Sequence, residues 1–231
     1  MTKRLAIIPA RGGSKRIPDK NIRNFSGKPV ISYILETVKN SNMFDVIHVS
    51  TDSEIIAGLV DKLGFTVDFM RPAQLSDDYT PIMPVLKYVL EEYSKQGKIF
   101  DQVWMFMPTA VFLDISDIIE INKLFLQSNQ KKSILGVSEY SPPIEWAFTM
   151  ENNGELVPLQ PGKFAIRSQD LHPKYYDVGS FSLFTSTTVT SSDGAGNDNG
   201  FIGYVMPKYK AIDIDTLDDW KFSEALYKGL F

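Results

Sequence analysis

The stretch LAIIPARGGSKRIPDKN at residues 5–21 constrains the fold more than any other part of the chain. Its first residues are apolar and β-prone, and Pro9 cannot donate a backbone hydrogen bond to a sheet, so we expect a buried strand that ends there. Gly12 and Gly13 allow backbone N–H groups to approach an anion without an intervening Cβ. The stretch therefore predicts a strand that leads into a phosphate-binding segment, residues 10–21, which we call the basic loop.

Arg11, Lys15, Arg16 and Lys20 give the basic loop its charge, and such a run is often only a solvated surface. Here, however, residues 1–28 contain eight of the 24 basic residues of the chain and one of its 28 acidic residues. A single positive region in an acidic protein is typical of a focused anion site. The glycine spacing is neither G-x-x-x-x-G-K-[ST] nor G-x-G-x-x-G, so it does not support a P-loop triphosphatase or a dinucleotide-binding protein.

The composition excludes several classes of protein. A length of 231 residues with 43% hydrophobic residues is typical of a globular chain with one substantial core. A net charge of −4 argues against nucleic acid or an anionic membrane as partner, and the lack of cysteine excludes disulfides and thiolate chemistry. Arg11 interrupts the N-terminal apolar segment before a signal peptide would be complete, and the apolar stretch at 103–113 is too short to span a bilayer. We therefore expect a cytoplasmic protein whose partners are small molecules.

Strand-like and helix-like segments alternate along much of the chain. We predict strands at residues 5–8, 45–50, 65–70, 103–107, 133–137, 201–205 and 209–215. We predict helices at 29–40, after the capping residues 51–53, at 82–93, at 115–126 and after the capping residue Thr216. This order is typical of an α/β fold in which helices cover both faces of a mostly parallel sheet.

The pattern changes from about residue 139. Prolines at 142, 143 and 161, together with the Asn152-Asn153-Gly154 sequence, interrupt short β-prone pieces. We interpret residues 139–200 as a small β-rich insertion over the active face of the sheet, within a single domain that spans residues 1–231.

Asp213 and Asp215 are the most informative acidic residues. On a strand their side chains would share one face, while Ile212 and Ile214 would pack on the other. Two neighbouring carboxylates repel one another unless a cation lies between them, and hard oxygen ligands suit Mg²⁺. An exposed strand face followed by a pre-helical aspartate would explain the same residues, but the basic loop elsewhere in the chain favours the metal.

Other polar residues have more ordinary explanations. Asp52 and Ser53 are better explained as helix caps than as catalytic groups. Neither histidine belongs to the motif of a nucleophilic triad, and His48 is expected in the core. The Asp77-Asp78 pair suits a helix cap and a ligand equally well.

Five motifs follow one another along the chain: IPARGGSKRIPDKN, VSTDSEII, RPAQLSDDYT, RSQDLHPKYYDVGSFSLF and AIDIDTLDDW. In this order they resemble the motifs of the acylneuraminate cytidylyltransferase family, over nearly the whole chain. The resemblance implies a Rossmann-like sheet of the nucleotide-diphospho-sugar transferase type, and a homodimer in which the 139–200 region reaches toward the partner. It also implies the reaction of CTP with a nine-carbon 2-keto-3-deoxy sugar acid, which gives the CMP-sugar and pyrophosphate and uses Mg²⁺ as cofactor.

The resemblance further implies roles for individual residues. The residues implied for the nucleotide are Ala10, Arg11, Gly12, Gly13, Ser14, Lys20, Asn21, Arg71, Ser76, Asp78 and Thr80. Among them, Arg11 and Lys20 would bind the triphosphate with the help of the loop at Ser14, whereas Asn21 and Arg71 would hold the cytosine together with residues 76–80. The catalytic set would be completed by Asp213 and Asp215 as ligands of the metal.

For the sugar acid the resemblance implies Met107, Thr109, Arg167, Gln169 and Asp177, with the Arg167 fork facing the carboxylate of the sugar. Sialic acid enzymes resemble L-Q-P-T-S-P where this chain has Met107, which cannot replace the hydrogen bonds of a glutamine amide. They also tend toward N-G-A-I-Y where this chain has DVGSF from Asp177 onward. These departures favour pseudaminic acid over legionaminic or N-acetylneuraminic acid.

The implied chemistry is nucleotidyl transfer, in which the anomeric 2-hydroxyl attacks the α-phosphorus in line with the departing pyrophosphate. The sequence shows no dedicated general base. A catalytically inactive nucleotide-binding homologue and a nicotinamide-dependent oxidoreductase are the alternatives. The oxidoreductase lacks its glycine fingerprint, and an inactive homologue would be expected to lose Arg11, Lys20 or one of the two aspartates, all of which are present.

Overall fold

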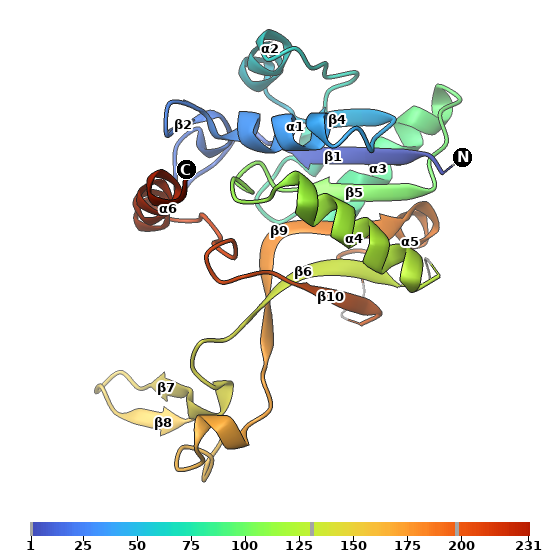
Figure 1. Ribbon diagram of the computed structural model, residues 1–231. Helices are drawn as coiled ribbons and strands as arrows, with labels where there is room; N and C mark the ends of the chain where they lie inside the picture. Colours follow the sequence, from blue (N-terminus) through green and yellow to red (C-terminus); the bar gives the residue numbers. More distant parts are fainter. Residues whose placement is uncertain (1, 130–131, 197–198) are drawn as a thin grey trace.

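The computed structural model describes residues 2–129, 132–196 and 199–231. Its centre is a six-stranded sheet with the strand order β10-β6-β9-β5-β1-β4 (Figure 1). The strands are β1 (Arg4–Pro9), β4 (Val46–Ser50), β5 (Gln102–Phe106), β6 (Ser133–Glu139), β9 (Tyr175–Thr185) and β10 (Phe201–Val205). β1 pairs in parallel with β4 and β5, and β10 pairs in parallel with β6, whereas β9 runs antiparallel to both of its neighbours. The prediction of a mostly parallel sheet is therefore confirmed.

The helices are α1 (Val30–Asn40), α2 (Glu54–Lys62), α3 (Ile82–Lys95), α4 (Ile115–Gln127), α5 (Ser186–Thr190) and α6 (Leu217–Leu230). All of these except α5 lie where the sequence predicted a helix, whereas α5 falls in the region that was predicted to be β-rich. Ser53 caps α2 by accepting a hydrogen bond from the amide three residues further on. Asp114 with Asp117 and Thr216 with Asp219 form reciprocal capping boxes at the starts of α4 and α6. The caps read from the sequence at Ser53 and Thr216 are thus confirmed.

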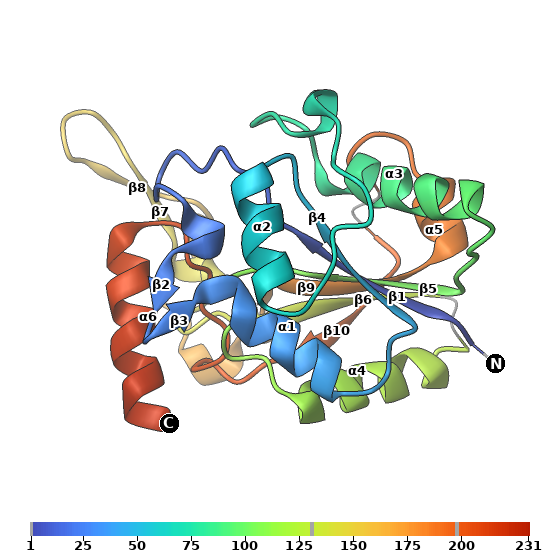
Figure 2. The same ribbon diagram turned by 90° about the horizontal axis from the view of Figure 1, so that it is seen from above.

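Helices cover both faces of the sheet, with α1 and α4 on one side and α3 and α5 on the other (Figure 2). The side chains of β1 alternate accordingly. Ala6 and Ile8 belong to the apolar cluster that includes α1 and α4, whereas Leu5 and Ile7 belong to the cluster that includes α3. A strand that is buried on both faces reads as a continuous apolar run, which is why the LAIIP sequence identified β1.

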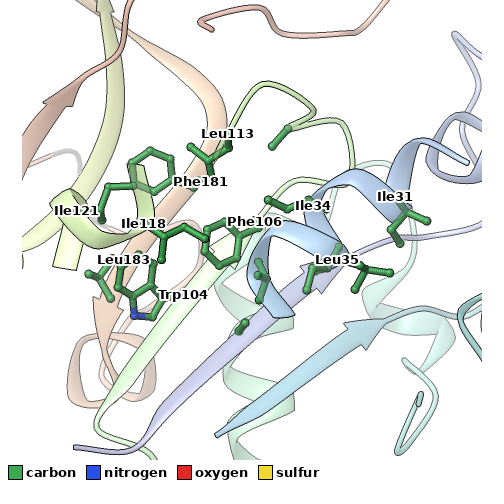
Figure 3. Close-up of a cluster of buried hydrophobic side chains, with 14 of the residues drawn as sticks. Ile31, Ile34, Leu35, Trp104, Phe106, Leu113, Ile118, Ile121, Phe181 and Leu183 are labelled. Atoms are coloured by element: carbon green, nitrogen blue, oxygen red, sulfur yellow. The ribbon is translucent and has the colours of Figure 1, made fainter. Parts of the chain in front are cut away.

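Two aromatic side chains of β5 form the centre of the larger cluster. Trp104 and Phe106 are fully buried, and their rings stack with centroids 5.9 Å apart. Figure 3 shows Phe106 between Ile34 of α1 and Ile118 of α4. This packing fixes the position of β5 and so of the loop that follows it.

The strand predicted at residues 65–70 is wrong. The segment forms no ladder, and its neighbours hold it instead: the amide of Arg71 donates to the carbonyl of Thr51 at 2.7 Å, and the Tyr88 hydroxyl donates to the carbonyl of Met70 at 3.1 Å. Phe69 stacks on His48 with ring centroids 4.4 Å apart. The apolar residues of this segment are half-buried, and side-chain packing rather than strand pairing covers them.

The strand predicted at residues 209–215 is also wrong. After a turn in which the Lys210 amide donates to the carbonyl of Pro207 at 2.8 Å, the chain runs as an irregular loop into α6. Ile214 is nonetheless fully buried, and Ile212 packs against the same small cluster. An extended loop over an apolar surface therefore produces the same alternation as a strand.

The segment that projects from the sheet is shorter than the predicted insertion at 139–200. Residues 140–174, which we call the arm, project beyond the sheet and carry a hairpin of β7 (Phe148–Met150) and β8 (Leu156–Pro158) (Figure 1). After the arm, β9 returns to the centre of the sheet between β5 and β6, so its residues belong to the core. Residues 197 and 198 of the predicted region lie outside the described residues.

A second short hairpin, β2 (Asn24–Phe25) and β3 (Lys28–Pro29), joins the basic loop to α1. Phe25 is fully buried against Trp220 of α6, with ring centroids 5.5 Å apart.

Within the described ranges, none of the helices is both long and apolar enough to cross a lipid bilayer.

Candidate active site

A pocket of about 480 Å³ opens where β1 and β5 end. Ligands of such sheets bind beyond the carboxyl ends of the strands, so this is the expected position for a site. The pocket is lined by Pro9, Arg11, Ser14, Lys15, Arg16, Ile17, Lys20, Asn21, Arg71, Leu75, Asp77, Asp78, Thr80, Ile82, Val85, Met105, Met107, Gly179, Asp213 and Asp215. No arm residue belongs to this lining, so the predicted position of the insertion over the active face is not found within one chain.

The basic loop is anchored to the end of β4. The amide of Gly12 donates to Asp52 Oδ1 at 2.9 Å, and the side-chain amide of Asn21 donates to the carbonyl of Arg11 at 2.9 Å. A Cβ added at Gly12 would lie 3.0 Å from the Cβ of Ser53, so this glycine permits a close approach to the start of α2. The Gly12 amide, which we expected to face an anion, is therefore used by Asp52 to hold the loop.

Carboxylates in the pocket pair with the cations of the basic loop. Arg11 Nη2 lies 2.7 Å from Asp78 Oδ1, and Lys15 contacts the same carboxylate. Hydrogen bonds from Lys15 and Arg11 lower the pKa of Asp78 below its usual value. Asp78 was assigned to the cytosine from the resemblance, whereas here its contacts are with the residues assigned to the triphosphate.

Asp213 and Asp215 line the pocket together, as expected. Lys20 Nζ lies 3.0 Å from Asp215 Oδ1 and Arg16 Nη1 lies 2.8 Å from Asp215 Oδ2. The pKa of Asp213 is raised, first because the carboxyl is partly buried and second because Asp215 repels its charged form. Two neighbouring carboxylates, one of them with its charged form disfavoured, are an environment that a cation would stabilise.

Sites that bind a metal ion through protein side chains alone usually have more than two such ligands. Among the described residues there is no group of three or more histidine, cysteine, aspartate or glutamate side chains arranged to hold a metal ion. Mg²⁺ is commonly held by one or two carboxylates together with water and substrate phosphate, so the oxygen donors of Asp213 and Asp215 fit that ion when a phosphate ligand is also bound.

Arg71 is buried at the pocket wall. Its Nε donates to Ser50 Oγ at 3.0 Å and its Nη2 donates to the carbonyl of Ser50 at 2.6 Å. Burial lowers the pKa of Arg71 to about 10, so the guanidinium stays charged at neutral pH.

Asp77 accepts hydrogen bonds from the amides of Tyr79 and Thr80, which fixes the turn that brings Thr80 to the pocket. This use of Asp77 is a turn cap rather than a helix cap.

The residues assigned to the sugar are only partly brought together. Met107 lines the pocket, and Thr109 is buried beside an adjoining small cavity that Asp213 also lines. Asp177 lies outside the lining, and its Oδ1 accepts the amide hydrogen of Gly179 at 2.8 Å. Arg167 and Gln169 lie in the arm, where Arg167 Nε pairs with Asp170 Oδ2 at 2.9 Å. These two arm residues therefore do not line the pocket of their own chain, and their role at the sugar stays a prediction.

Some assigned residues support the pocket without lining it. Ala10 is fully buried and its amide donates to the carbonyl of Ser50 at 2.8 Å. Gly12 and Gly13 precede Ser14, which does line the pocket. The Ser76 hydroxyl donates to the carbonyl of Pro72 at 3.1 Å and stabilises the segment that carries Asp78 and Thr80.

The sequence analysis missed several lining residues. Ile82 and Val85 come from the first turn of α3, and their i, i+3 spacing could have indicated a second apolar position facing the site. Gly179 stands within an otherwise β-prone run, a pattern that often marks a bulge beside a ligand.

Comparison with known proteins agrees with this geometry. The model of a family described as cytidylyltransferase matches residues 5–130, which include the basic loop and Arg71. The chain belongs to the cytidylyltransferase family. The resemblance drawn from the five motifs is thereby confirmed.

Similar proteins extend the match along the chain. The chain is 38% identical to a pseudaminic acid cytidylyltransferase of Campylobacter jejuni, over 98% of its own length and 97% of the relative's. It is 31% identical to a CMP-N,N'-diacetyllegionaminic acid synthase of Legionella pneumophila, over 96% and 95% of the two chains. A solved structure of CMP:2-keto-3-deoxy-manno-octonic acid synthetase with CTP superposes with a TM-score of 0.73 at 15% identity, covering 100% of both chains. That structure supports the fold, and the two relatives identify the branch of the family that the chain resembles.

Proposed function

We propose that the protein transfers CMP from CTP to a nine-carbon 2-keto-3-deoxy sugar acid, and that this acid is pseudaminic acid. The observation that carries the proposal is the similarity of almost the whole chain to pseudaminic acid cytidylyltransferase, at 38% identity. The pocket supports it, because Arg11, Lys20, Asp213 and Asp215 converge on one space at the end of the sheet.

At the α-phosphorus the reaction forms one bond and breaks one, and the proton of the attacking hydroxyl passes to solvent water. The anomeric 2-hydroxyl oxygen attacks the α-phosphorus of CTP and loses its proton, while the bond from that phosphorus to the pyrophosphate oxygen breaks. Arg11 and Lys20 would bind the triphosphate and neutralise charge on the departing pyrophosphate. Catalysis would then consist mainly of positioning and charge stabilisation, since no side chain in the pocket is an evident general base.

Asp213 and Asp215 are the residues that would hold Mg²⁺. Their oxygen donors and the raised pKa of Asp213, which burial and Asp215 cause, fit a divalent cation. When bound, Mg²⁺ supplies charge neutralisation at the phosphate oxygens and can lower the pKa of a nearby hydroxyl.

Nucleotide choice is proposed to come from the opposite wall. Asn21 and Arg71, with residues 76–80, would hold the cytosine. Arg71 is fixed by two hydrogen bonds to Ser50, and Asp77 fixes the turn that presents Thr80. A rigid wall of this kind suits discrimination between the donor and acceptor patterns of C and U.

The sugar end is proposed to involve a second copy of the chain. Arg167 lies in the arm and outside its own pocket, so an arm that crosses to a partner would bring the RSQD motif to the partner's pocket. Exposed apolar side chains on the arm support such a contact: Phe148, Met150, Leu156, Leu159 and Phe164. Surfaces of this kind are enriched at interfaces between protein chains. We therefore propose a homodimer, which light scattering would test.

The test of the reaction class is pyrophosphate release from CTP in the presence of pseudaminic acid, with UTP as the matched control. We expect release with CTP and little with UTP. Bound CTP without pyrophosphate release, with pseudaminic, legionaminic and N-acetylneuraminic acids alike, would support the inactive homologue instead.

A further inference from the structure

β9 is irregular where it passes the pocket. Its register with β6 shifts between Leu135, which lies opposite Ser182, and Val137, which lies opposite Asp177. β9 therefore carries extra residues at this point, which makes residues 177–181 a β-bulge. We call this segment the β9 bulge.

The bulge presents a bare backbone to the proposed metal ligand. Gly179 has φ +61°, in the left-handed region, and it lines the pocket together with Asp213. A Cβ added at Gly179 would lie 3.5 Å from Asp213 Oδ2. The lack of a side chain here leaves the Asp213 carboxylate accessible from the pocket.

Two hydrogen bonds fix the bulge. Asp177 Oδ1 accepts the amide hydrogen of Gly179 at 2.8 Å, and the carbonyl of Ser180 accepts the amide hydrogen of Met107 at 2.8 Å. The first bond holds the turn at Gly179, and the second ties the bulge to the residue that follows β5.

Side-chain packing between β6 and β9 also stabilises the β9 bulge. A Cβ added at Gly136 of β6 would lie 2.7 Å from Phe181 Cε1, so the ring of Phe181 occupies the space that a side chain on β6 would need. Phe181 is buried in the main apolar cluster. The bulge is thus a packed feature of the sheet rather than a loose loop.

We propose that Asp177 is a positioning residue, which acts by accepting the Gly179 amide hydrogen and so keeps the β9 bulge clear of Asp213. This assignment differs from a sugar ligand, and it rests on the proposed function for the identity of the groups that Asp213 binds. An amide oxygen can accept the same hydrogen bond, so an asparagine at this position would serve nearly as well. Position 177 would then contribute little to the choice between sugar acids.

The test compares D177N with D177A in the full-length protein. Mn²⁺ is the metal probe, bound in the presence of CTP and followed by electron paramagnetic resonance, and kcat and KM are measured with Mg²⁺, CTP and the sugar acid. For D177A we expect Mn²⁺ affinity and kcat each to fall about tenfold, the factor that corresponds to one lost hydrogen bond. For D177N we expect at least half of the wild-type value in both measurements, because the acceptor is kept.

Two results would overturn the proposal. If D177N is impaired as much as D177A, the negative charge matters rather than the acceptor; if both behave as wild type, the hydrogen bond has no role. G179A provides an independent variant in case D177A does not fold. Its methyl group beside Asp213 should weaken Mn²⁺ binding, and wild-type affinity in G179A would equally contradict the proposal.

The proposed function is judged separately, by D213N in the same Mn²⁺ measurement. If D213N binds Mn²⁺ as well as the wild type does, Asp213 is not a metal ligand. The role of Asp177 would then be tested by comparing kcat between D177N and D177A.

Discussion

The parts of the pocket that we propose for the nucleotide and for the sugar, which we call the nucleotide half and the sugar half, are built in different ways. The nucleotide half comes mainly from segments near one another in the first part of the chain, where the pairing of β1 with β4 places the basic loop beside Asp52 and Arg71. The sugar half is assembled from Met107 after β5, Gly179 in the β9 bulge and Asp213 in the loop before α6. Its implied carboxylate ligand, Arg167, is in the arm. A local βα motif forms the first half, whereas long-range strand pairing and the proposed partner form the second.

The halves also rest on different supports. Beneath the nucleotide half, His48 is buried and contacts Tyr93, which in turn donates to Asp68 at 2.7 Å. Beneath the sugar half, Lys210 is paired with Asp117 at 2.7 Å and with Asp114 at 2.5 Å. The first support joins a buried histidine and a tyrosine to one carboxylate, whereas the second is a lysine paired with two carboxylates, so acid and mutation should affect them differently.

The largest expected effect is on turnover. We predict that Arg11→Ala and Asp215→Ala each lower kcat about 10²–10³-fold, the range seen when one preorganised charge or donor at a transition state is removed. Pyrophosphate release measures the loss, and circular dichroism checks the fold. Asp218→Asn, at a side chain that is 94% exposed, is the matched control and should keep full turnover. Near-normal release from either pocket variant would remove the site assignment.

The next effect concerns acid stability of the nucleotide half. Burial lowers the pKa of His48 to about 4 from an ordinary value of 6.5, so the folded protein holds this ring neutral. The unfolded chain therefore binds the proton first, and stability falls as pH drops from 6.5 toward 4. The loss attributable to His48 should approach about 3 kcal/mol.

Urea unfolding at several pH values, with His48→Asn as comparison, measures that loss. The asparagine amide can still donate to Tyr93 but does not titrate in this range. The wild-type curve should fall more steeply than the variant curve between pH 6.5 and pH 4. Parallel curves would show that His48 does not make the nucleotide half sensitive to acid.

A smaller effect is expected beneath the sugar half. Lys210→Met should lower the free energy of unfolding by about 2 kcal/mol, because it leaves the buried carboxylate of Asp117 without a positive partner, held only by hydrogen bonds from the Tyr204 hydroxyl and the Asp114 amide. Burial opposes ionisation of Asp114, but hydrogen bonds from Lys210 and its neighbours lower its pKa to about 2. The cost should therefore be the same at pH 5 and pH 8. Lys123→Met, which removes an exposed ion pair, is the control and should change stability little.

The smallest effect is expected on sugar preference. Met107→Gln introduces an amide into the pocket wall, so kcat/KM for pseudaminic acid should fall several-fold while the KM for CTP stays nearly constant. Kinetics with each substrate varied in turn would show this split. A larger change for CTP than for the sugar would place Met107 in the nucleotide half and break the division described above.

Much of the fold was predictable because apolar residues mark burial. The run that ends at Pro9 identified β1, and the capping residues Ser53 and Thr216 identified the starts of two helices. The same signal failed at residues 65–70, because Phe69 is half-buried by stacking on His48 without pairing in the sheet. Apolar alternation reports a buried face and does not show which backbone groups are paired.

The site residues that lie close to one another in the sequence were easier to predict than those that long-range strand pairing brings together. Arg11 and Lys20 follow β1 directly, and Asp213 and Asp215 share the pocket because an extended loop alternates like a strand. Gly179 was missed because its place in the pocket depends on the register between β9 and β6, whereas a glycine in a β-prone run indicates a bulge but not what the bulge faces. The position of Arg167 could not be predicted, because the arm that carries it projects beyond the sheet of its own chain (Figure 1).

The most direct test of the account is a competition between sugar acids. The purified protein would receive CTP, Mg²⁺ and equal concentrations of pseudaminic, legionaminic and N-acetylneuraminic acids, and mass spectrometry would quantify the products at early times. We predict that CMP-pseudaminic acid is the main product and that Asp215→Ala forms almost none of it. CMP-N-acetylneuraminic acid as the main product would contradict the assignment.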